Sequence, residues 1–141
     1  MSDETGPASA ADRFATDLGV RVLAAEPGRA VVDLVVEDRH LNDRGIAHGG
    51  ALFSLADVAL AVAANPPGQV ALVPTATVHF IRPARLGARL RATATVEHSG
   101  RTLGLYSVVI SDGDSLVARL TGQSFTVPGW TNPSPGAEED R

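Results

Sequence analysis

A chain of 141 residues, 44% of them hydrophobic and 20% charged, is long enough for one globular domain and too short for two ordinary ones. Its net charge of −4 argues against general binding of nucleic acids, which normally requires a basic surface. It has no cysteine, and all 12 of its cationic residues are arginine, which excludes disulfides, thiolate metal ligands, thiol nucleophiles, a Walker A lysine and Schiff-base chemistry.

The N-terminal part of the chain is predicted to be a short flexible segment followed by a helix. Residues 1–7 form the flexible N-terminus, and they lack the basic and apolar regions of a secretory signal. Residues 8–18 have a helical pattern, which Gly19 ends. We therefore expect a cytoplasmic protein.

Two strands and an irregular segment are predicted next. Val20–Ala24 and Arg29–Val36 are rich in β-branched residues, and the turn-forming Glu26-Pro27-Gly28 lies between them. Residues 37–47 are polar and contain no periodic pattern, so they are expected to form a loop.

One long helix follows this loop. Residues 51–64 consist mostly of strong helix formers, and Asn65-Pro66 ends them because the residue before a proline is disfavoured in helical conformation. The helix is apolar almost all round, which indicates burial, and it is too short to span a bilayer.

The remainder of the chain predicts an antiparallel series of strands. These strands share β-branched residues and glycine-containing turns at Ser99-Gly100 and Asp112-Gly113, and they cover Val70–Ile81, Ala88–Glu97, Leu103–Ile110 and Ser115–Val127. Residues 128–141 are rich in Pro, Gly and acidic residues and are expected to be disordered. A single α+β domain over residues 8–127 is predicted, with a sheet that curls around one buried helix.

The segment before and within the long helix resembles a known signature. Residues 41–57 read LNDRGIAHGGALFSLAD, which is similar to hotdog-fold acyl-CoA thioesterases of the phenylacetate-degradation (PaaI) type. Asn65 and Gly68, and the later run Phe80-Ile81-Arg82-Pro83, also match, so the resemblance extends over residues 14–127. It implies a hotdog fold, hydrolysis of acyl-CoA with a possible phenylacetyl-type acyl group, and no metal or other cofactor.

The glycines before the helix suit the binding of an oxyanion. A helix N-terminus presents unpaired N–H groups and a partial positive charge, and glycine lets a ligand approach the backbone. Such a site stabilises the oxyanion formed when a thioester carbonyl is attacked. The resemblance assigns this part to the Gly49 amide, with His48 positioning the segment or assisting. The alternative is that Gly49-Gly50 only makes a tight loop.

Asp57 is a candidate catalytic carboxylate. Aspartate is a poor helix former and costly to bury, yet every residue from Val58 to Ala64 is apolar. A single polar position facing water is the alternative interpretation. The resemblance implies that Asp57 is either the general base that activates water or a nucleophile that forms a mixed anhydride, and the sequence leaves both open.

The spacing of the two candidates predicts a dimer. Gly49 and Asp57 are eight residues apart, which is about 12 Å along a helix. One carbonyl group cannot contact both, so the two groups must come from different subunits whose helices run antiparallel across a twofold axis. The family is also known for dimer-interface sites within homotetramers.

Further residues are assigned to the substrate. By resemblance, Asn42 lies near the thioester, although ordering its own loop is an equal alternative. Gly50 and Asn65 are assigned to the substrate or its coenzyme A portion. Arg82 and Arg85 suit coenzyme A phosphates, with solvated strand charges as the alternative.

Other functions are weaker. His40, His79 and His98 are expected to be structural or exposed, no metal motif is found, and no Gly-x-Ser-x-Gly nucleophile elbow exists. A non-catalytic acyl-CoA-binding module remains an alternative, as does a hotdog hydratase or dehydratase.

Overall fold

The computed structural model describes residues 12–131. They form two α-helices, one short 3-10 helix (η1) and six strands, which are α1 Arg13–Leu18, β1 Arg21–Glu26, β2 Arg29–Val35, η1 Asp38–His40, α2 Gly49–Ala64, β3 Ala71–Phe80, β4 Arg89–Ser99, β5 Leu103–Asp112 and β6 Ser115–Thr126. The predicted flexible segment 1–7 and the predicted helical residues 8–11 lie outside the described residues. Of the predicted tail, residues 132–141 also lie outside, and Pro128 and Gly129 form a turn after β6.

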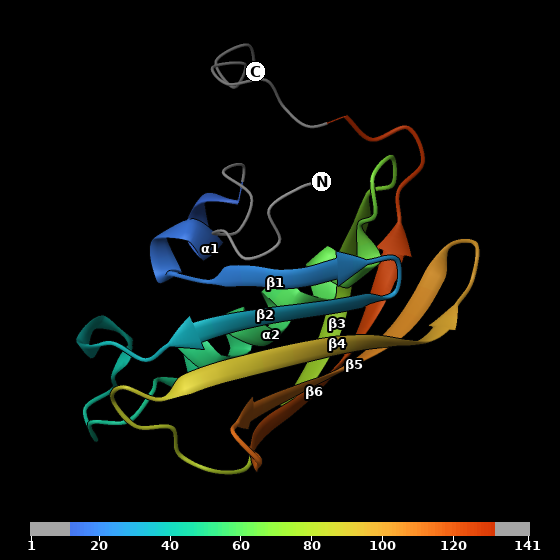
Figure 1. Cartoon of the computed structure of the whole chain (residues 1–141). Helices are drawn as coiled ribbons and strands as arrows, with labels where there is room; N and C mark the ends of the chain where they lie inside the picture. Colours follow the sequence, from blue (N-terminus) through green and yellow to red (C-terminus); the bar gives the residue numbers. More distant parts are fainter. Residues whose placement is uncertain (1–11, 132–141) are drawn as a thin grey trace.

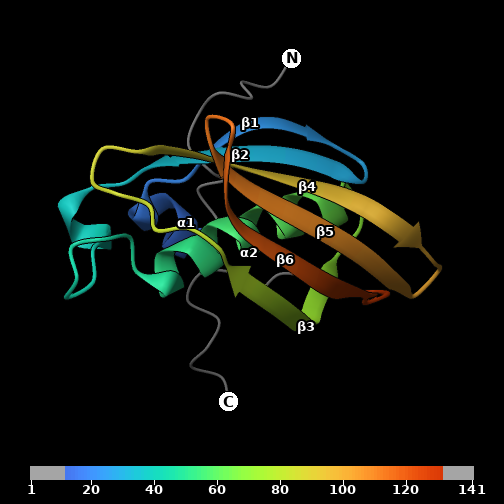
Figure 2. The same ribbon diagram turned by 90° about the horizontal axis from the view of Figure 1, so that it is seen from below.

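The strands form one antiparallel sheet that curves around α2. Their order is β1-β2-β4-β5-β6-β3, so β1 and β3 are the outer strands. Figure 1 shows α2 behind the sheet, and the view from below in Figure 2 shows the strands bending around it. The predicted α+β hotdog architecture is confirmed.

Small residues let α2 approach the sheet closely. The strands present buried Ala92, Ala94 and Ala118 to the helix, and Leu60 on α2 is fully buried. Gly122 on β6 lies directly beneath Leu60, because a Cβ built on this glycine would overlap the Cδ1 of Leu60. The close approach of α2 to the sheet therefore depends on residue 122 being glycine, which has no side chain.

Adding one methyl group at this contact is expected to destabilise the protein. Gly122→Ala forces Leu60 or the helix to move, and overpacking of this kind costs about 1–3 kcal/mol. Chemical denaturation monitored by circular dichroism measures the loss. Gly113→Ala is the comparison for an exposed turn glycine at positive φ with no neighbour near the added Cβ, where only backbone strain contributes. Unchanged stability of Gly122→Ala would mean that the contact is loose.

The C-terminal end of α2 is held by three other parts of the chain. The last four carbonyls of a helix have no partner within it. Here the Asn65 side chain donates to Ala61 O, the Asn65 backbone to Val62 O, the Gly28 amide to Ala63 O, and the Gln69 side chain to Ala64 O. Asn65 also exchanges two hydrogen bonds with Ala71, at 2.7 and 3.1 Å, and so joins the helix end to β3.

Asp33 is a buried carboxylate whose charge is fully paired. It lies on β2 with 2% of its surface exposed, although its neighbours in the strand are apolar. Arg21 from β1 donates to it at 2.9 and 3.1 Å, and Arg89 from β4 at 3.1 Å. The ion pairs join three adjacent strands and account for the buried charge.

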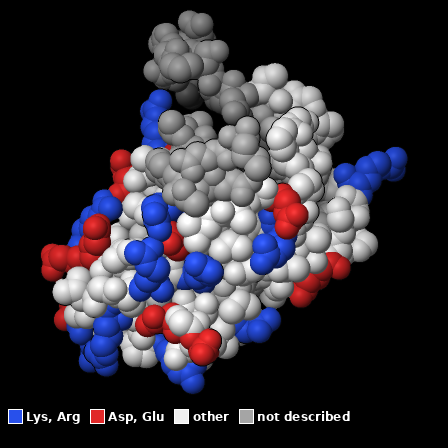
Figure 3. Space-filling view, in the orientation of Figure 1, with Lys and Arg blue, Asp and Glu red and all other residues white. Residues whose placement is uncertain are grey.

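The surface shows no separation of charge on the side viewed. Acidic and basic side chains are interspersed over the face in Figure 3. Within residues 12–131, no helix is long and apolar enough to cross a membrane.

Candidate functional site

His48 determines how α2 begins. Its backbone is extended, and its Nδ1 accepts a hydrogen bond of 2.8 Å from the Gly50 amide, so the histidine caps the helix. The helix therefore starts at Gly49, two residues earlier than the predicted start at Ala51. Since Nδ1 is the acceptor, a neutral His48 ring carries its proton on Nε2, and the residue as a whole is exposed.

The same cap leaves one amide of the first turn without a partner. Of the four N–H groups that begin a helix, those of Ala51 and Leu52 bond to the His48 carbonyl and that of Gly50 bonds to the His48 ring. The Gly49 N–H has no hydrogen-bond partner among the described residues. The partial positive charge at the start of α2 is therefore presented to a ligand by one free donor.

A cavity of about 390 Å³ opens beside Gly49. Asn42, Ile46 and the Phe80-to-Pro83 segment after β3 form its other walls. A Cβ on Gly49 would lie 3.2 Å from the Phe80 ring, so glycine also keeps this wall open. The cavity brings together three residues that were predicted to contact the substrate, Gly49, Asn42 and Arg82.

His40 holds the loop that carries His48. It is 3% exposed, its Nδ1 accepts from the Glu37 amide at 2.9 Å, and its Nε2 lies 2.8 Å from the Leu18 carbonyl. Its own carbonyl accepts from the His48 amide at 2.7 Å. The histidine thereby connects the end of α1 to the start of α2, which agrees with the structural role predicted for it. His79 and His98 are exposed, also as predicted.

Asp57 lies on the face of α2 that is turned away from the sheet. Phe53 and Ala61, one turn before and after it, are also incompletely buried on this face. Burial raises the pKa of the Asp57 carboxyl above its ordinary value, and the negative charge of Asp12 raises this pKa further. Unlike Asp33, Asp57 has no ion pair or side-chain hydrogen bond among residues 12–131. A half-buried carboxylate without a partner requires an explanation other than stability.

Asn42 and the two arginines differ in how freely they can reach a ligand. The Asn42 Oδ1 accepts from the Arg44 and Ile46 amides at 2.9 and 3.3 Å, so this residue orders its own loop while it lines the cavity beside Gly49. Arg82 is exposed and donates to the Leu116 carbonyl at 2.9 Å. Arg85 is exposed beside the same segment, and its backbone forms a bridge to Ile46.

Two predicted binding residues have their polar groups engaged elsewhere. The Gly50 amide is bonded to His48, and the Asn65 side chain donates to the Ala61 and Ala71 carbonyls and accepts from the Ala71 amide at the start of β3. Asn65 does line a cavity, but a polar contact from its side chain to a ligand would replace one of these bonds. Its assignment was made by resemblance, and its isolation after an apolar helix also suits a capping residue.

Sequence patterns did not indicate the specific contacts of Phe80, His40 and Asp12. Each acts through tertiary contacts, with Phe80 against Gly49, His40 against His48, and Asp12 on the pKa of Asp57. Asp12 did carry a signal, since it begins α1 as an N-cap whose side chain accepts from the Ala15 amide at 3.0 Å.

Comparisons with known proteins agree with this fold. Residues 44–119 match the model of the Thioesterase superfamily, a range that includes His48, Gly49 and Asp57. The chain is 38% identical over 119 residues to acyl-coenzyme A thioesterase PaaI of Escherichia coli, which covers 84% of this chain and 85% of that protein.

Solved structures give the same result. The E. coli PaaI structure, from the phenylacetic acid degradation operon, superposes with a TM-score of 0.81 and 39% identity, and covers 84% of this chain and 86% of that one. A mutant of PaaI from Thermus thermophilus gives a TM-score of 0.78 at 39% identity, with coverages of 81% and 98%. A family model over more than half of the chain, together with relatives of this similarity, shows that the protein belongs to the thioesterase superfamily.

Proposed function

We propose that the protein hydrolyses acyl-CoA thioesters at a site made by Asp57 of one subunit and the Gly49 amide of another. The observation that carries the proposal is a pair of unsatisfied groups. The Asp57 carboxylate and the Gly49 N–H are both without partners among the described residues. The carboxylate is an acceptor suited to activating water, and the N–H is a donor suited to binding an oxyanion.

The twofold arrangement follows from the position of both groups on α2. They are separated by eight residues, or about 12 Å along the helix, so one chain cannot place both on one carbonyl. Antiparallel α2 helices from two subunits bring each Asp57 to the other subunit's Gly49 and create two equivalent sites. The exposed face that carries Phe53 and Asp57 supplies the contact. A homotetramer made of two such dimers is proposed from the resemblance to the family.

The chemistry needs only these groups and water. Asp57 takes a proton from water as the water oxygen bonds to the thioester carbon, the carbonyl oxygen becomes negative at the Gly49 amide, and the tetrahedral intermediate expels the coenzyme A thiolate. Alternatively, Asp57 attacks first, releases the thiolate, and the mixed anhydride is then hydrolysed. In either case His48 holds the helix start, Asn42 lies beside the carbonyl, and no metal or other cofactor is required.

The coenzyme A portion is proposed to leave the site along the segment after β3. Arg82 and Arg85 lie there with exposed guanidinium groups, which suit phosphates. Gly50 and Asn65 are proposed to contribute close backbone and wall contacts rather than side-chain hydrogen bonds, because their polar groups are engaged. Cytoplasmic location and a phenylacetyl-type acyl group are proposed from the resemblance.

An assay of thiol release tests the function. Purified protein is mixed with a panel of acyl-CoA thioesters, and free coenzyme A is measured with a thiol reagent. Continuous release supports a hydrolase. Tight binding without release would instead indicate a binding module, and consumption of an enoyl thioester without release would indicate a hydratase.

Sedimentation tests the proposed assembly. The active species is expected to have at least twice the 14.6 kDa mass of the chain. Full activity in a monomer would contradict the shared site.

A further inference from the structure

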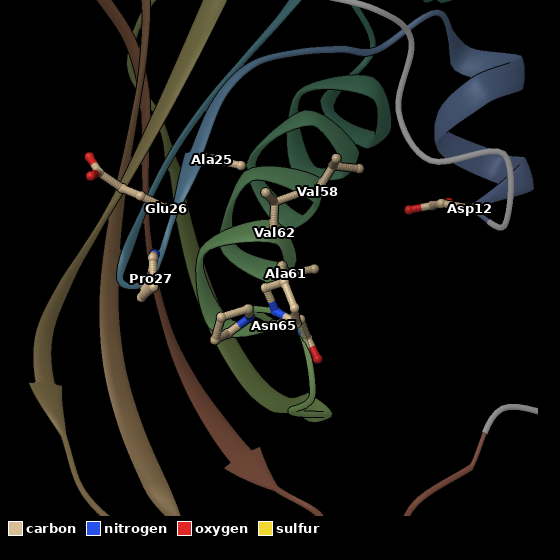
Figure 4. Close-up of a pocket in the computed structure, with 10 residues that line it drawn as sticks. Asp12, Ala25, Glu26, Pro27, Val58, Ala61, Val62 and Asn65 are labelled. Carbon is tan, nitrogen blue, oxygen red and sulfur yellow. The ribbon is translucent and has the colours of Figure 1, made fainter. Parts of the chain in front are cut away.

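A cavity of about 400 Å³ lies beside the C-terminal half of α2 (Figure 4). Val58, Ala61 and Val62 form its helix wall, and Ala25 and Pro27 from β1 and its turn form the opposite wall. The volume is in the range of small-molecule pockets, which are about 300–1,000 Å³ and mainly apolar. Of the residues that line it, the proposed function uses only Asn65, as a wall contact.

The cavity adjoins the proposed catalytic carboxylate. Val58 is the residue after Asp57, and Ala61 is one helical turn beyond it. Asp12, whose charge raises the pKa of Asp57, also lines the cavity. A thioester carbonyl at Asp57 can therefore direct its acyl group into the cavity while the coenzyme A portion runs toward the other subunit's Gly49.

We propose that this cavity receives the acyl group, and that Asp12 makes the enzyme select neutral apolar acyl groups against those that end in a carboxylate. The inference rests on the proposed function and specifies its substrate class. The cavity is called the acyl pocket below.

The charge distribution supports the selection. In Figure 4 the Asp12 carboxylate points toward α2, whereas that of Glu26 points away from it. None of the described residues that line the acyl pocket is cationic. A carboxylate on the far end of an acyl group would enter an apolar space beside Asp12 and Asp57 with no positive partner, and a buried unpaired charge is strongly disfavoured.

The second cavity near Asp57 provides a matched comparison. It lies beside the N-terminal half of α2, has a volume of about 340 Å³, and includes Arg39, His40 and His48 in its lining. Ser54 lies in this cavity three residues before Asp57, just as Ala61 lies in the acyl pocket four residues after it. A leucine introduced at each of these two positions therefore tests which cavity holds the acyl group.

The first experiment fills each cavity with a leucine. Ala61→Leu and Ala25→Leu fill the acyl pocket from its two walls, and Ser54→Leu fills the other cavity. We expect kcat/KM for hexanoyl-CoA and phenylacetyl-CoA to fall by about tenfold or more in the first two variants, with acetyl-CoA little affected. Ser54→Leu is expected to change kcat/KM by the same factor for all three substrates. A loss with Ser54→Leu that depends on chain length, or equal losses for all acyl groups in both pocket variants, would overturn the assignment.

The second experiment removes the charge. Asp12→Asn retains an N-cap for α1, because asparagine caps as well as aspartate. Hexanoyl-CoA and adipoyl-CoA have the same chain length and differ in a terminal carboxylate. Wild type is expected to prefer hexanoyl-CoA, and Asp12→Asn to reduce this preference by a few-fold, since the carboxylate is partly screened by solvent. An unchanged preference would remove Asp12 from the selection.

The proposed function and the acyl pocket can be overturned separately. A wild-type protein that releases coenzyme A from none of the substrates overturns the proposed function, and the acyl pocket with it. A wild-type protein that hydrolyses the panel, while its pocket variants show no dependence on acyl length, leaves the function standing and overturns only the pocket.

Discussion

Asp57→Asn is expected to lower kcat for acyl-CoA hydrolysis by about 10²–10⁴-fold while the protein remains folded. Asparagine has the same shape but neither accepts a proton from water nor attacks a carbonyl. Steady-state release of coenzyme A measures the loss, and circular dichroism with sedimentation checks the fold and assembly. Hydrolysis at the wild-type rate across a broad thioester panel would remove Asp57 from its proposed role.

The same variant is expected to be more stable than wild type at neutral pH. The pKa of Asp57 is raised in the folded chain by burial and by Asp12, so the ionised carboxylate destabilises the folded state above this pKa. The penalty disappears below the ordinary aspartate pKa of about 3.9, where both states are protonated. The Tm of Asp57→Asn should therefore exceed that of wild type at neutral pH and approach it in acid.

Asp57→Glu is the conservative variant and should be partly active at best, because its carboxylate is displaced by one methylene.

Gly49→Pro is expected to lower kcat by about 10²–10³-fold, the usual effect of losing one oxyanion donor. Proline lacks the N–H, and the first position of a helix is where it is tolerated best. His48 already has φ −62° and ψ 140°, the extended conformation that a residue before proline prefers. The substitution therefore removes the proposed donor with little disturbance of α2.

Gly49→Ala is the matched control for this change. It adds a Cβ near the Phe80 ring, as proline does, but it retains the N–H. Phe80 is 53% exposed and has room to move, so the alanine variant should keep most of its turnover. Equal losses in the alanine and proline variants would show that the wall of the cavity matters, rather than the amide.

A mixture of the two inactive variants tests whether the site is shared. If Asp57→Asn and Gly49→Pro chains exchange freely, half of the dimers are mixed, and each mixed dimer has one intact site. About a quarter of wild-type activity should therefore return. No recovery, in a mixture shown by mass spectrometry to contain heterodimers, would mean that both groups act within one chain.

The two isolated aspartates show how far sequence alone could identify the site. Asp33 and Asp57 both interrupt apolar segments, and the sequence indicates only Asp57, because it lies within a predicted apolar helix and in the segment that resembles the family signature. The structure separates them physically, since Asp33 is held by Arg21 and Arg89 whereas Asp57 has no partner among the described residues. Those arginines lie 12 and 56 residues away from Asp33, so the sequence could not indicate the pairing.

The fold could be predicted because its strands and turns follow from local sequence patterns. The details of the site could not, because they depend on contacts between side chains. Strand boundaries were correct to within about two residues because β-branched runs and turn glycines act locally. Which glycine offers a free amide depends on the rotamer of His48, which bonds to Gly50 and so leaves Gly49 available. The effect of Asp12 on the pKa of Asp57 acts between distant segments of the chain, for which one sequence carries no pattern.

The two ends of α2 are held with unequal strength, and this should determine how the enzyme fails on heating. The C-terminal carbonyls bond to a hairpin turn, to Gln69 and to Asn65, which is itself tied to β3. The opposite end relies on His48 and its loop. Fraying should begin there, because regions with fewer anchors open at lower free energy. Catalysis would then be lost at temperatures where the sheet is still intact, and hydrogen exchange would find the first helical turn unprotected well before the strands.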